Sequence, residues 1–151
     1  MKKEKIGFGE GAEIAFAIPG EPSRVTHQSG TRIGKNGRVY KKKQLLEWEQ
    51  QLMEAMKAKA PETPLEGPIL LEVTFGFQAR RKKDCFTYKT TRPDTDNLIK
   101  TVKDCLTSSG FWIDDSQVVI EFGQKLWVPD PGIIIKIEEL GARCEDWRIE
   151  E

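Results

Sequence analysis

The sequence predicts an α/β fold of the α+β kind, a two-layer sandwich in which a mixed four-stranded sheet carries two main helices on one face. Two observations lead to this prediction. Four segments alternate apolar and polar residues as strands do, and two others repeat apolar residues at helical spacing. Because a sheet and a helix that are each apolar on one side bury those sides together, two layers are expected.

The first strand and a basic segment begin the pattern. Residues 13–18 alternate in polarity, as expected for a strand. The apolar side chains that share one side are Ile14, Phe16 and Ile18. Residues 23–40 contain little apolar material and include the turn signal Asn36-Gly37, so we expect a loop or an open hairpin there.

A helix and a second strand come next. Residues 43–58 place apolar side chains three and four positions apart, which predicts an amphipathic helix. Those side chains are Leu45, Trp48, Leu52 and Met56. Residues 69–78 return to alternation and predict a strand. Its apolar side consists of Leu71, Val73, Phe75 and Phe77.

The last three elements are a helix and two strands. Residues 97–108 are helical in spacing, and Gly110 suits the position that closes a helix. The apolar side of this helix consists of Leu98, Val102, Cys105 and Leu106. Strands are expected over 118–126 and 133–137, on either side of a Pro-Gly turn. The complete order is therefore strand, helix, strand, helix, strand, strand.

Length and composition predict one domain with a charged surface. The 151 residues are 38% apolar and 32% charged, which is enough for a single core. Residues 1–12 are charged and Gly-rich, and a flexible N-terminal segment is expected there. Residues 13–140 are expected to form the domain, and residues 141–151 an acidic C-terminal tail.

Cysteine usage and hydropathy exclude several classes of protein. The three cysteines are widely spaced and the chain has one histidine, His27, so a zinc site is not expected. No apolar run approaches the roughly 20 residues of a membrane helix. The basic start lacks the apolar stretch of a signal peptide. We therefore expect a cytoplasmic protein with reduced thiols and no membrane partner.

Positive charge is concentrated in two segments, although the formal net charge of the chain is zero. Such segments either contact phosphates or form solvated loops. The first, between Ser23 and Leu46, has no acid, and the second, between Arg80 and Arg92, has one, Asp84. The candidate phosphate-binding residues are Arg24, Arg32, Lys35, Arg38, Lys41, Lys42, Lys43, Arg80, Arg81, Lys82, Lys83 and Arg92.

One stretch carries the residues most suited to chemistry, Arg92-Pro-Asp-Thr-Asp-Asn-Leu-Ile-Lys100. The carboxylates of Asp94 and Asp96 lie two residues apart, and Lys100 follows Asp96 by one helical turn on the same face. A later segment, Gly110-Phe-Trp-Ile-Asp-Asp115, adds two more acids.

Chain geometry predicts that the two groups of acids meet. A helix over 97–108 is about 18 Å long. The six steps from Ser109 to Asp115 cover about 20 Å when extended. If Gly110 reverses the chain, Asp114 or Asp115 returns to the start of the helix. Carboxylates that converge beside a lysine favour Mg²⁺ or Mn²⁺, which prefer oxygen ligands.

Simpler interpretations remain open for each part. Asp94 or Asp96 can act as an ordinary helix cap. The Asp114-Asp115 pair can be an ordinary turn. The aromatic pair that precedes it, Phe111 and Trp112, is expected in the core or in a dimer contact rather than stacked on a base.

These residues resemble the RusA family of Holliday-junction resolvases, endonucleases of bacteria and their prophages. The family pattern is Asp-x-Asp-Asn-Leu-x-Lys, a helix with Asp-Ala-Leu, then Gly-hydrophobic-aromatic-x-Asp-Asp-x-Gln-Val. Here it corresponds to residues 94–100, 104–106 and 110–118, within a stretch of about 25 residues. The chain departs from it in having Thr90-Thr91-Arg92-Pro93 where some members have a dense basic run, which bears on junction selectivity.

The resemblance implies a Mg²⁺-dependent endodeoxyribonuclease, with Mn²⁺ as a substitute, that acts as a homodimer on four-way DNA junctions in recombination and repair. By position, the catalytic and metal-binding carboxylates are Asp94, Asp96 and Asp115. Asp114 is a further candidate metal ligand, and Lys100 matches the essential lysine of the family. Lys100 is then expected to orient the nucleophile or to offset charge on the phosphoryl oxygens.

Two other functions fit part of the pattern. A non-catalytic protein that binds branched DNA or replication forks retains the motif for its metal or its charge. A nucleotide phosphohydrolase also needs acids and Mg²⁺, but the sequence contains no Gly-rich phosphate-binding loop.

Overall fold

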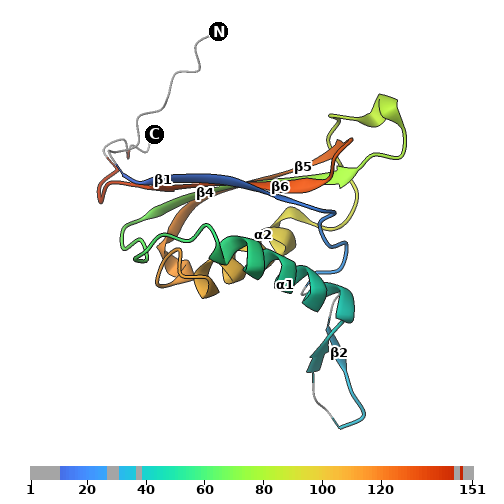
Figure 1. Cartoon of the computed structure of the whole chain (residues 1–151), viewed down its shortest axis with the longest axis horizontal. Coiled ribbons are helices and arrows are strands. Elements are labelled where there is room, and N and C mark those ends of the chain that lie inside the picture. Colours follow the sequence, from blue (N-terminus) through green and yellow to red (C-terminus); the bar gives the residue numbers. More distant parts are fainter. Residues whose placement is uncertain (1–10, 27–30, 37–38, 145–146, 148–151) are drawn as a thin grey trace.

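The computed structural model places the sheet and the helices in two layers (Figure 1). It describes residues 11–26, 31–36, 39–144 and 147. Most of the expected N-terminal segment and acidic tail, and the side chains of Arg32, Arg38 and Lys41, lie outside the described residues.

Four strands form one sheet in the order β1-β6-β4-β5. The neighbours β4 and β5 are parallel, whereas β1 and β4 both pair with β6 in antiparallel fashion. The strands are β1 (Glu13–Pro19), β4 (Ile69–Gln78), β5 (Val118–Val128) and β6 (Gly132–Glu139). Both main helices, α1 (Lys43–Lys57) and α2 (Thr95–Ser108), cover one face of this sheet (Figure 1). The predicted two-layer α+β fold and its mixed sheet are confirmed.

The first basic segment contains a small hairpin, so the hairpin interpretation of residues 23–40 is the correct one. Strand β2 (Thr31–Ile33) pairs antiparallel with β3 (Val39–Lys41). Asn36 lies in the turn between them, as the sequence predicted. The hairpin extends from the helical layer away from the main sheet (Figure 1).

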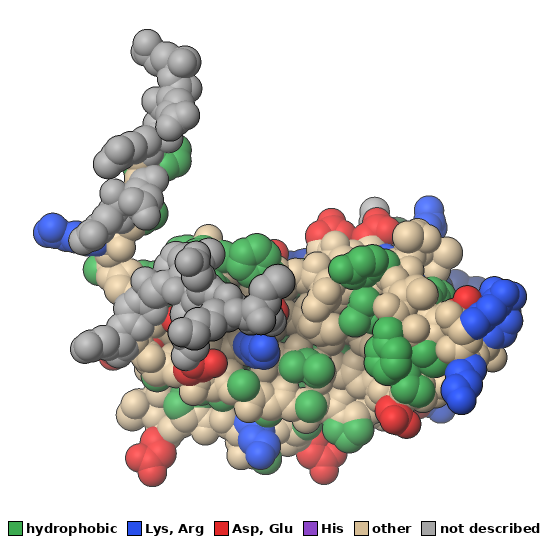
Figure 2. All heavy atoms as spheres, turned by 90° about the horizontal axis from the view of Figure 1, so that it is seen from above, with side chains coloured by type: hydrophobic (Ala, Val, Ile, Leu, Met, Phe, Trp, Pro, Cys, Tyr) green, Lys and Arg blue, Asp and Glu red, His purple; other side chains and the backbone are tan. Residues whose placement is uncertain are grey.

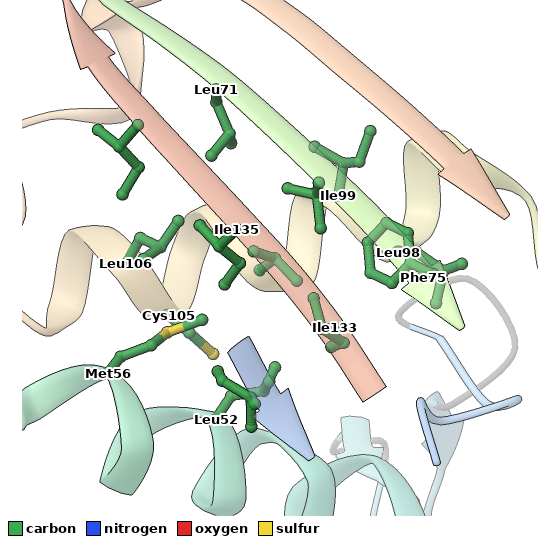
Figure 3. Packing of buried hydrophobic residues seen from close by; sticks show 14 of the residues in the cluster. Leu52, Met56, Leu71, Phe75, Leu98, Ile99, Cys105, Leu106, Ile133 and Ile135 are labelled. Carbon is green, nitrogen blue, oxygen red and sulfur yellow. The ribbon is translucent and has the colours of Figure 1, made fainter. Parts of the chain in front are cut away.

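The core lies between the sheet and the two helices. Figure 3 shows sheet residues such as Leu71, Phe75 and Ile135 on one side, with Met56 of α1 and Leu106 of α2 on the other. The apolar positions predicted on both helices are all buried. This agreement follows from periodicity, because helical spacing of three and four and strand spacing of two each put apolar side chains on a single side.

Phe111 and Trp112 belong to the same core. Their exposed fractions are 0% and 1%, and their rings meet edge to face. The backbone N–H of Phe111 donates to the carbonyl of Leu106, and Leu65 pairs with Trp112 in an isolated bridge. The expectation of a core position is confirmed, so these rings are unavailable for stacking on a base.

Helix α2 runs antiparallel to β5, which fixes the orientation of the functional segments. Lys103, in the second half of α2, pairs at 2.9 Å with Glu121, in the first half of β5. Lys125, in the second half of β5, donates at 2.8 Å to the carbonyl of Pro93, just before α2. Gly123 allows this close approach, since a Cβ at that position would overlap the side chain of Ile99. The start of α2 and the end of β5 therefore lie together.

Two further expectations concern membranes and thiols. Within the described ranges, no helix combines the length and the apolar character that crossing a bilayer requires. Cys85, Cys105 and Cys144 are free thiols, and Cys105 is buried in the core.

Candidate functional site

The first half of the candidate site lies at the N-terminus of α2. Asp94 occupies the N-cap position with extended backbone, but its side chain makes no capping hydrogen bond. Asp96 lies in the first turn, where the helix dipole favours a negative charge. Both side chains are exposed. The helix-cap interpretation therefore does not account for the carboxylate of Asp94, which faces solvent and is open to an external ligand.

Two lysines fix the segment that leads into Asp94. The ammonium group of Lys125 donates to the carbonyls of Thr91 at 2.7 Å and Pro93 at 2.8 Å. The ammonium group of Lys89 donates to the carbonyl of Arg92 at 2.7 Å and to the hydroxyl of Thr91. Three successive carbonyls are thus held by two cations, which orients the chain where α2 begins.

Lys89 is unusual because it is a buried cation, with an exposed fraction of 4%. Its ammonium group lies 4.5 Å from the ring centroid of Trp127 and 5.1 Å from that of Phe77, at cation–π distance. Burial lowers the pKa of Lys89, and the charges of Lys125 and Arg24 lower it further, whereas Glu21 opposes them. Carbonyls and rings therefore hold the cation in place of water.

Lys100 lies one turn beyond Asp96 on the exposed surface of α2. Its ammonium group is 3.9 Å from the carboxylate of Asp104, and the Lys100 side chain is 61% exposed. A long ion pair in water stabilises a protein by little. The ammonium group is therefore able to turn toward a bound phosphate.

Asp115 lies at the opposite end of α2. Its carboxylate accepts a hydrogen bond from the hydroxyl of Thr107, which accepts one at 2.7 Å from the indole N–H of Trp112. Asp96 and Thr107 are eleven residues apart in α2, which is about 16 Å along the helix axis. The prediction that Asp114 or Asp115 returns to the start of the helix is wrong for a single chain.

The physical reason is local burial after Gly110. Phe111 and Trp112 pack into the core beside the end of α2, so the chain does not run extended toward the start of the helix. A short 3₁₀ turn, η2 (Asp115–Gln117), then leads directly into β5. Arithmetic on chain length could not detect this, because it depends on tertiary packing.

Asp114 is the cap of that turn. Its carboxylate accepts from the backbone N–H of Ser116 at 2.8 Å, and the side chain of Gln117 accepts from the N–H of Asp114 at 3.0 Å. The hydrogen bonds from Ser116 lower the pKa of Asp114. The ordinary-turn interpretation thus describes Asp114, whereas the carboxylate of Asp115 points to α2.

The acids form two groups at the two ends of α2. Asp94 and Asp96 are one group, while Asp104, Asp114 and Asp115 line a shallow depression at the other end. Across the part of the chain that the structure describes, no three His, Cys, Asp or Glu side chains come together as a metal site. The donors in both groups are carboxylate oxygens, which fit Mg²⁺ or Mn²⁺ rather than zinc.

The predicted phosphate-binding residues lie in two separate places. The second basic segment forms the loop 79–92, which projects at one end of the sheet and includes the short helix η1 (Lys82–Asp84) (Figure 1). Lysine and arginine side chains gather at that end of the molecule in Figure 2. Arg24 lines one cavity with Arg80, Arg81 and Arg92. Lys35, Lys42 and Lys43 are exposed on or beside the β2–β3 hairpin, away from this loop.

Thr107→Val tests the hydroxyl group that links the indole of Trp112 to the carboxylate of Asp115. The valine keeps the shape of threonine but removes the hydroxyl, so the buried indole N–H of Trp112 loses its acceptor. We expect the free energy of unfolding to fall by about 1–3 kcal/mol, measured by urea denaturation. Thr107→Ser, which keeps the hydroxyl, is the control. A Val variant as stable as the Ser variant would show that this hydrogen bond contributes nothing.

Comparison with known proteins adds the family. The model of the family described as endodeoxyribonuclease RusA matches residues 19–138, which include both ends of α2 and the basic loop. A crossover junction endodeoxyribonuclease of Lactococcus phage r1t is 44% identical over 52 residues, 34% of this chain and 40% of that protein. RusA of Escherichia coli K12 is 38% identical over 50 residues, 33% of this chain and 42% of that protein.

A third relative matches over nearly its whole length. The uncharacterized protein YqaN of Bacillus subtilis strain 168 is 28% identical over 142 residues, which cover 85% of this chain and 98% of that protein. The chain spans less than half the length of the two relatives named as nucleases. The family match itself covers residues 19–138 of the 151, and it contains every described element except part of β1 and the last residue of β6. On that coverage, the chain belongs to the endodeoxyribonuclease RusA family.

Proposed function

We propose that the chain is a cytoplasmic, Mg²⁺-dependent endodeoxyribonuclease that resolves four-way DNA junctions in recombination and repair by paired phosphodiester hydrolysis. Family membership supports the reaction class. Two relatives are named crossover junction endodeoxyribonucleases, which supports branched DNA as the substrate. The observation that carries the proposal is the start of α2, where Asp94 is an N-cap residue whose carboxylate does not cap, beside the exposed Asp96 and Lys100.

The proposed chemistry assigns a role to each of these side chains. When bound, Mg²⁺ or Mn²⁺ supplies an acidified water and polarises the phosphate. Asp94 and Asp96 would hold the ion, together with the carboxylate of one Asp115. Lys100 shares a helix face with Asp96, from which it can orient the nucleophile or offset the charge that grows on the phosphoryl oxygens. The exposed cations of the basic loop would contact the DNA backbone and position it without reading its sequence.

A homodimer supplies the carboxylate that a single chain holds too far away. A two-fold axis perpendicular to α2 near its midpoint brings the Asp115 end of one copy opposite the Asp94 end of the other. Because the operation is symmetric, the same arrangement occurs twice. We propose that the partner's Asp115 completes each site, which yields one site for each of two cuts. The separation of about 16 Å along α2 supports this arrangement.

Cleavage of a labelled four-way junction tests the proposed function. We expect paired nicks with Mg²⁺, none with EDTA, and no cutting of a linear duplex of the same sequence. Equal inertness with Mg²⁺, Mn²⁺ and EDTA would contradict the nuclease. Tight junction binding without cutting would instead support a non-catalytic protein that binds branched DNA or replication forks, and phosphate release from free nucleotides would support a phosphohydrolase.

A further inference from the structure

A cavity of about 720 Å³ lies between the basic loop 79–92 and the end of β5. Its volume falls within the range of about 300–1,000 Å³ that is usual for small-molecule pockets, and it is too small for a double helix. Segments far apart in the sequence supply its wall. The lining includes Arg24, Arg80, Arg81, Lys89, Arg92 and Trp127.

The cavity is strongly cationic. Five lining residues are basic and one, Asp84, is acidic, and Asp84 is paired with Arg81 at 2.8 Å. Arg24 forms an exposed ion pair with Glu21 at 3.5 Å. Within the described part of the chain, the side chains of Arg80 and Arg92 have no hydrogen bond or ion pair, and both are exposed. Two guanidinium groups are therefore open to an anion, and their planar donors suit phosphate oxygens.

Trp127 adds an aromatic wall that is fixed in place. Its ring meets Phe77 edge to face, with the centroids 6.5 Å apart, and the Lys89 ammonium group lies over it. The residue is only half-buried, so part of the indole faces the cavity. Guanidinium groups beside an aromatic surface form the combination by which proteins hold single-stranded nucleic acid, since the cations contact the backbone and the ring stacks on a base.

The position of the cavity ties it to the acids at the start of α2. Arg92 lines the cavity and lies two residues before Asp94. Lys89 and Lys125 hold the carbonyls of residues 91–93, so one fixed segment carries both the cavity wall and the first acid. A phosphate in the cavity therefore lies beside the segment that leads into Asp94.

We propose that this cavity binds one unpaired nucleotide of the DNA strand next to the bond that is cut, with its phosphate on Arg80 and Arg92 and its base against Trp127. A paired nucleotide hides both faces of its base in the stack, so only an unpaired one presents a phosphate and a base face together. The inference rests on the proposed function, because the stacking of base pairs is interrupted at the branch point of a four-way junction, so a nucleotide there costs the least free energy to unpair. The cavity then selects which nucleotide lies at the cut.

Binding measured in EDTA tests the cavity without any cutting. The probes are a five-nucleotide single strand and a linear duplex, each titrated against the wild type and two variants. Arg80→Gln and Lys83→Gln each remove one charge from the same loop, but only Arg80 lines the cavity. We expect Arg80→Gln to weaken single-strand binding by roughly tenfold and duplex binding much less. Lys83→Gln is expected to weaken both DNAs by similar factors. The proposal would be overturned if the ratio of single-strand affinity to duplex affinity were the same in the two variants.

Tryptophan fluorescence gives a second measurement. Trp127 is the only tryptophan that lines the cavity, so the single strand is expected to quench its emission. Trp127→Phe keeps an aromatic core partner for Phe77 and should lose that quenching while binding persists. Quenching that is undiminished in Trp127→Phe would also overturn the proposal.

The two proposals fail separately. If the wild type cuts no junction but Arg80→Gln weakens single-strand binding more than duplex binding, the nuclease proposal is overturned and the cavity proposal stands. If the wild type cuts junctions but Arg80→Gln and Lys83→Gln have the same ratio of single-strand to duplex affinity, the cavity proposal is overturned and the nuclease proposal stands.

Discussion

Asp96→Asn is expected to abolish junction cutting while junction binding persists. The amide retains the size of the side chain but loses the charge that holds a hard cation. Residues outside the ligand shell already change metal affinity or activity by about 10–100-fold, so the loss of a ligand should exceed about 100-fold in cleavage rate. Asp96 is exposed, and its replacement leaves the core unchanged. The measurements are the single-turnover cutting rate with Mg²⁺ and the junction Kd in EDTA.

The matched control is Asp130→Asn, the same chemical change in the exposed turn between β5 and β6. It should cut at the wild-type rate. If Asp96→Asn also cuts at that rate, the assignment of Asp96 as a ligand is wrong. If Asp96→Asn loses junction binding as well as cutting, the substitution acts on DNA binding rather than on the chemical step.

A mixture of two inactive variants, Asp96→Asn and Asp115→Asn, is expected to recover activity. In a mixed dimer whose sites each combine the two chains, one site contains both substitutions and the other contains neither. With random association at equal concentrations, half of the dimers are mixed, so about a quarter of all sites are intact. Because an active mixed dimer has one site, its products are single nicks rather than paired cuts, which a denaturing gel resolves.

The control for this experiment uses two substitutions at the same end of α2. Asp94→Asn mixed with Asp96→Asn leaves no intact site under any arrangement, so no recovery is expected. A site formed within one chain also predicts no recovery for the first mixture. If mixed dimers form and no nicks appear, the partner's Asp115 does not complete the site.

The sequence predicted those parts of the fold that depend on local periodicity. Both main helices and all four strands of the sheet occur where the apolar spacing placed them, because burial of one side determines the element. The start of α2 at Thr95 rather than Asn97 shows the limit at element ends. The hairpin β2–β3 has strands of three residues each, too short for any periodic signal, so the turn residues alone indicated it.

The candidate site divides in the same way. Asp94, Asp96 and Lys100 are neighbours through chain spacing, which the sequence contains. The position of Asp115 depends on the burial of Phe111 and Trp112, which is a tertiary effect. Lys125 escaped notice because its partners are backbone carbonyls distant in the sequence, and no residue type identifies a carbonyl in advance.

The ammonium group of Lys89 changes how the ionic-strength dependence of DNA binding should be interpreted. Each protein cation that neutralises a DNA phosphate releases a condensed counterion, so the slope of affinity against salt counts these contacts. Lys89 is one of six basic residues between Arg80 and Arg92, but its charge already bonds to backbone and hydroxyl oxygens inside the protein. The loop therefore contributes fewer contacts to the salt slope of this chain than its number of basic residues suggests. A substitution of Lys89 is therefore expected to change the conformation of the loop more than the electrostatic attraction between the protein and DNA.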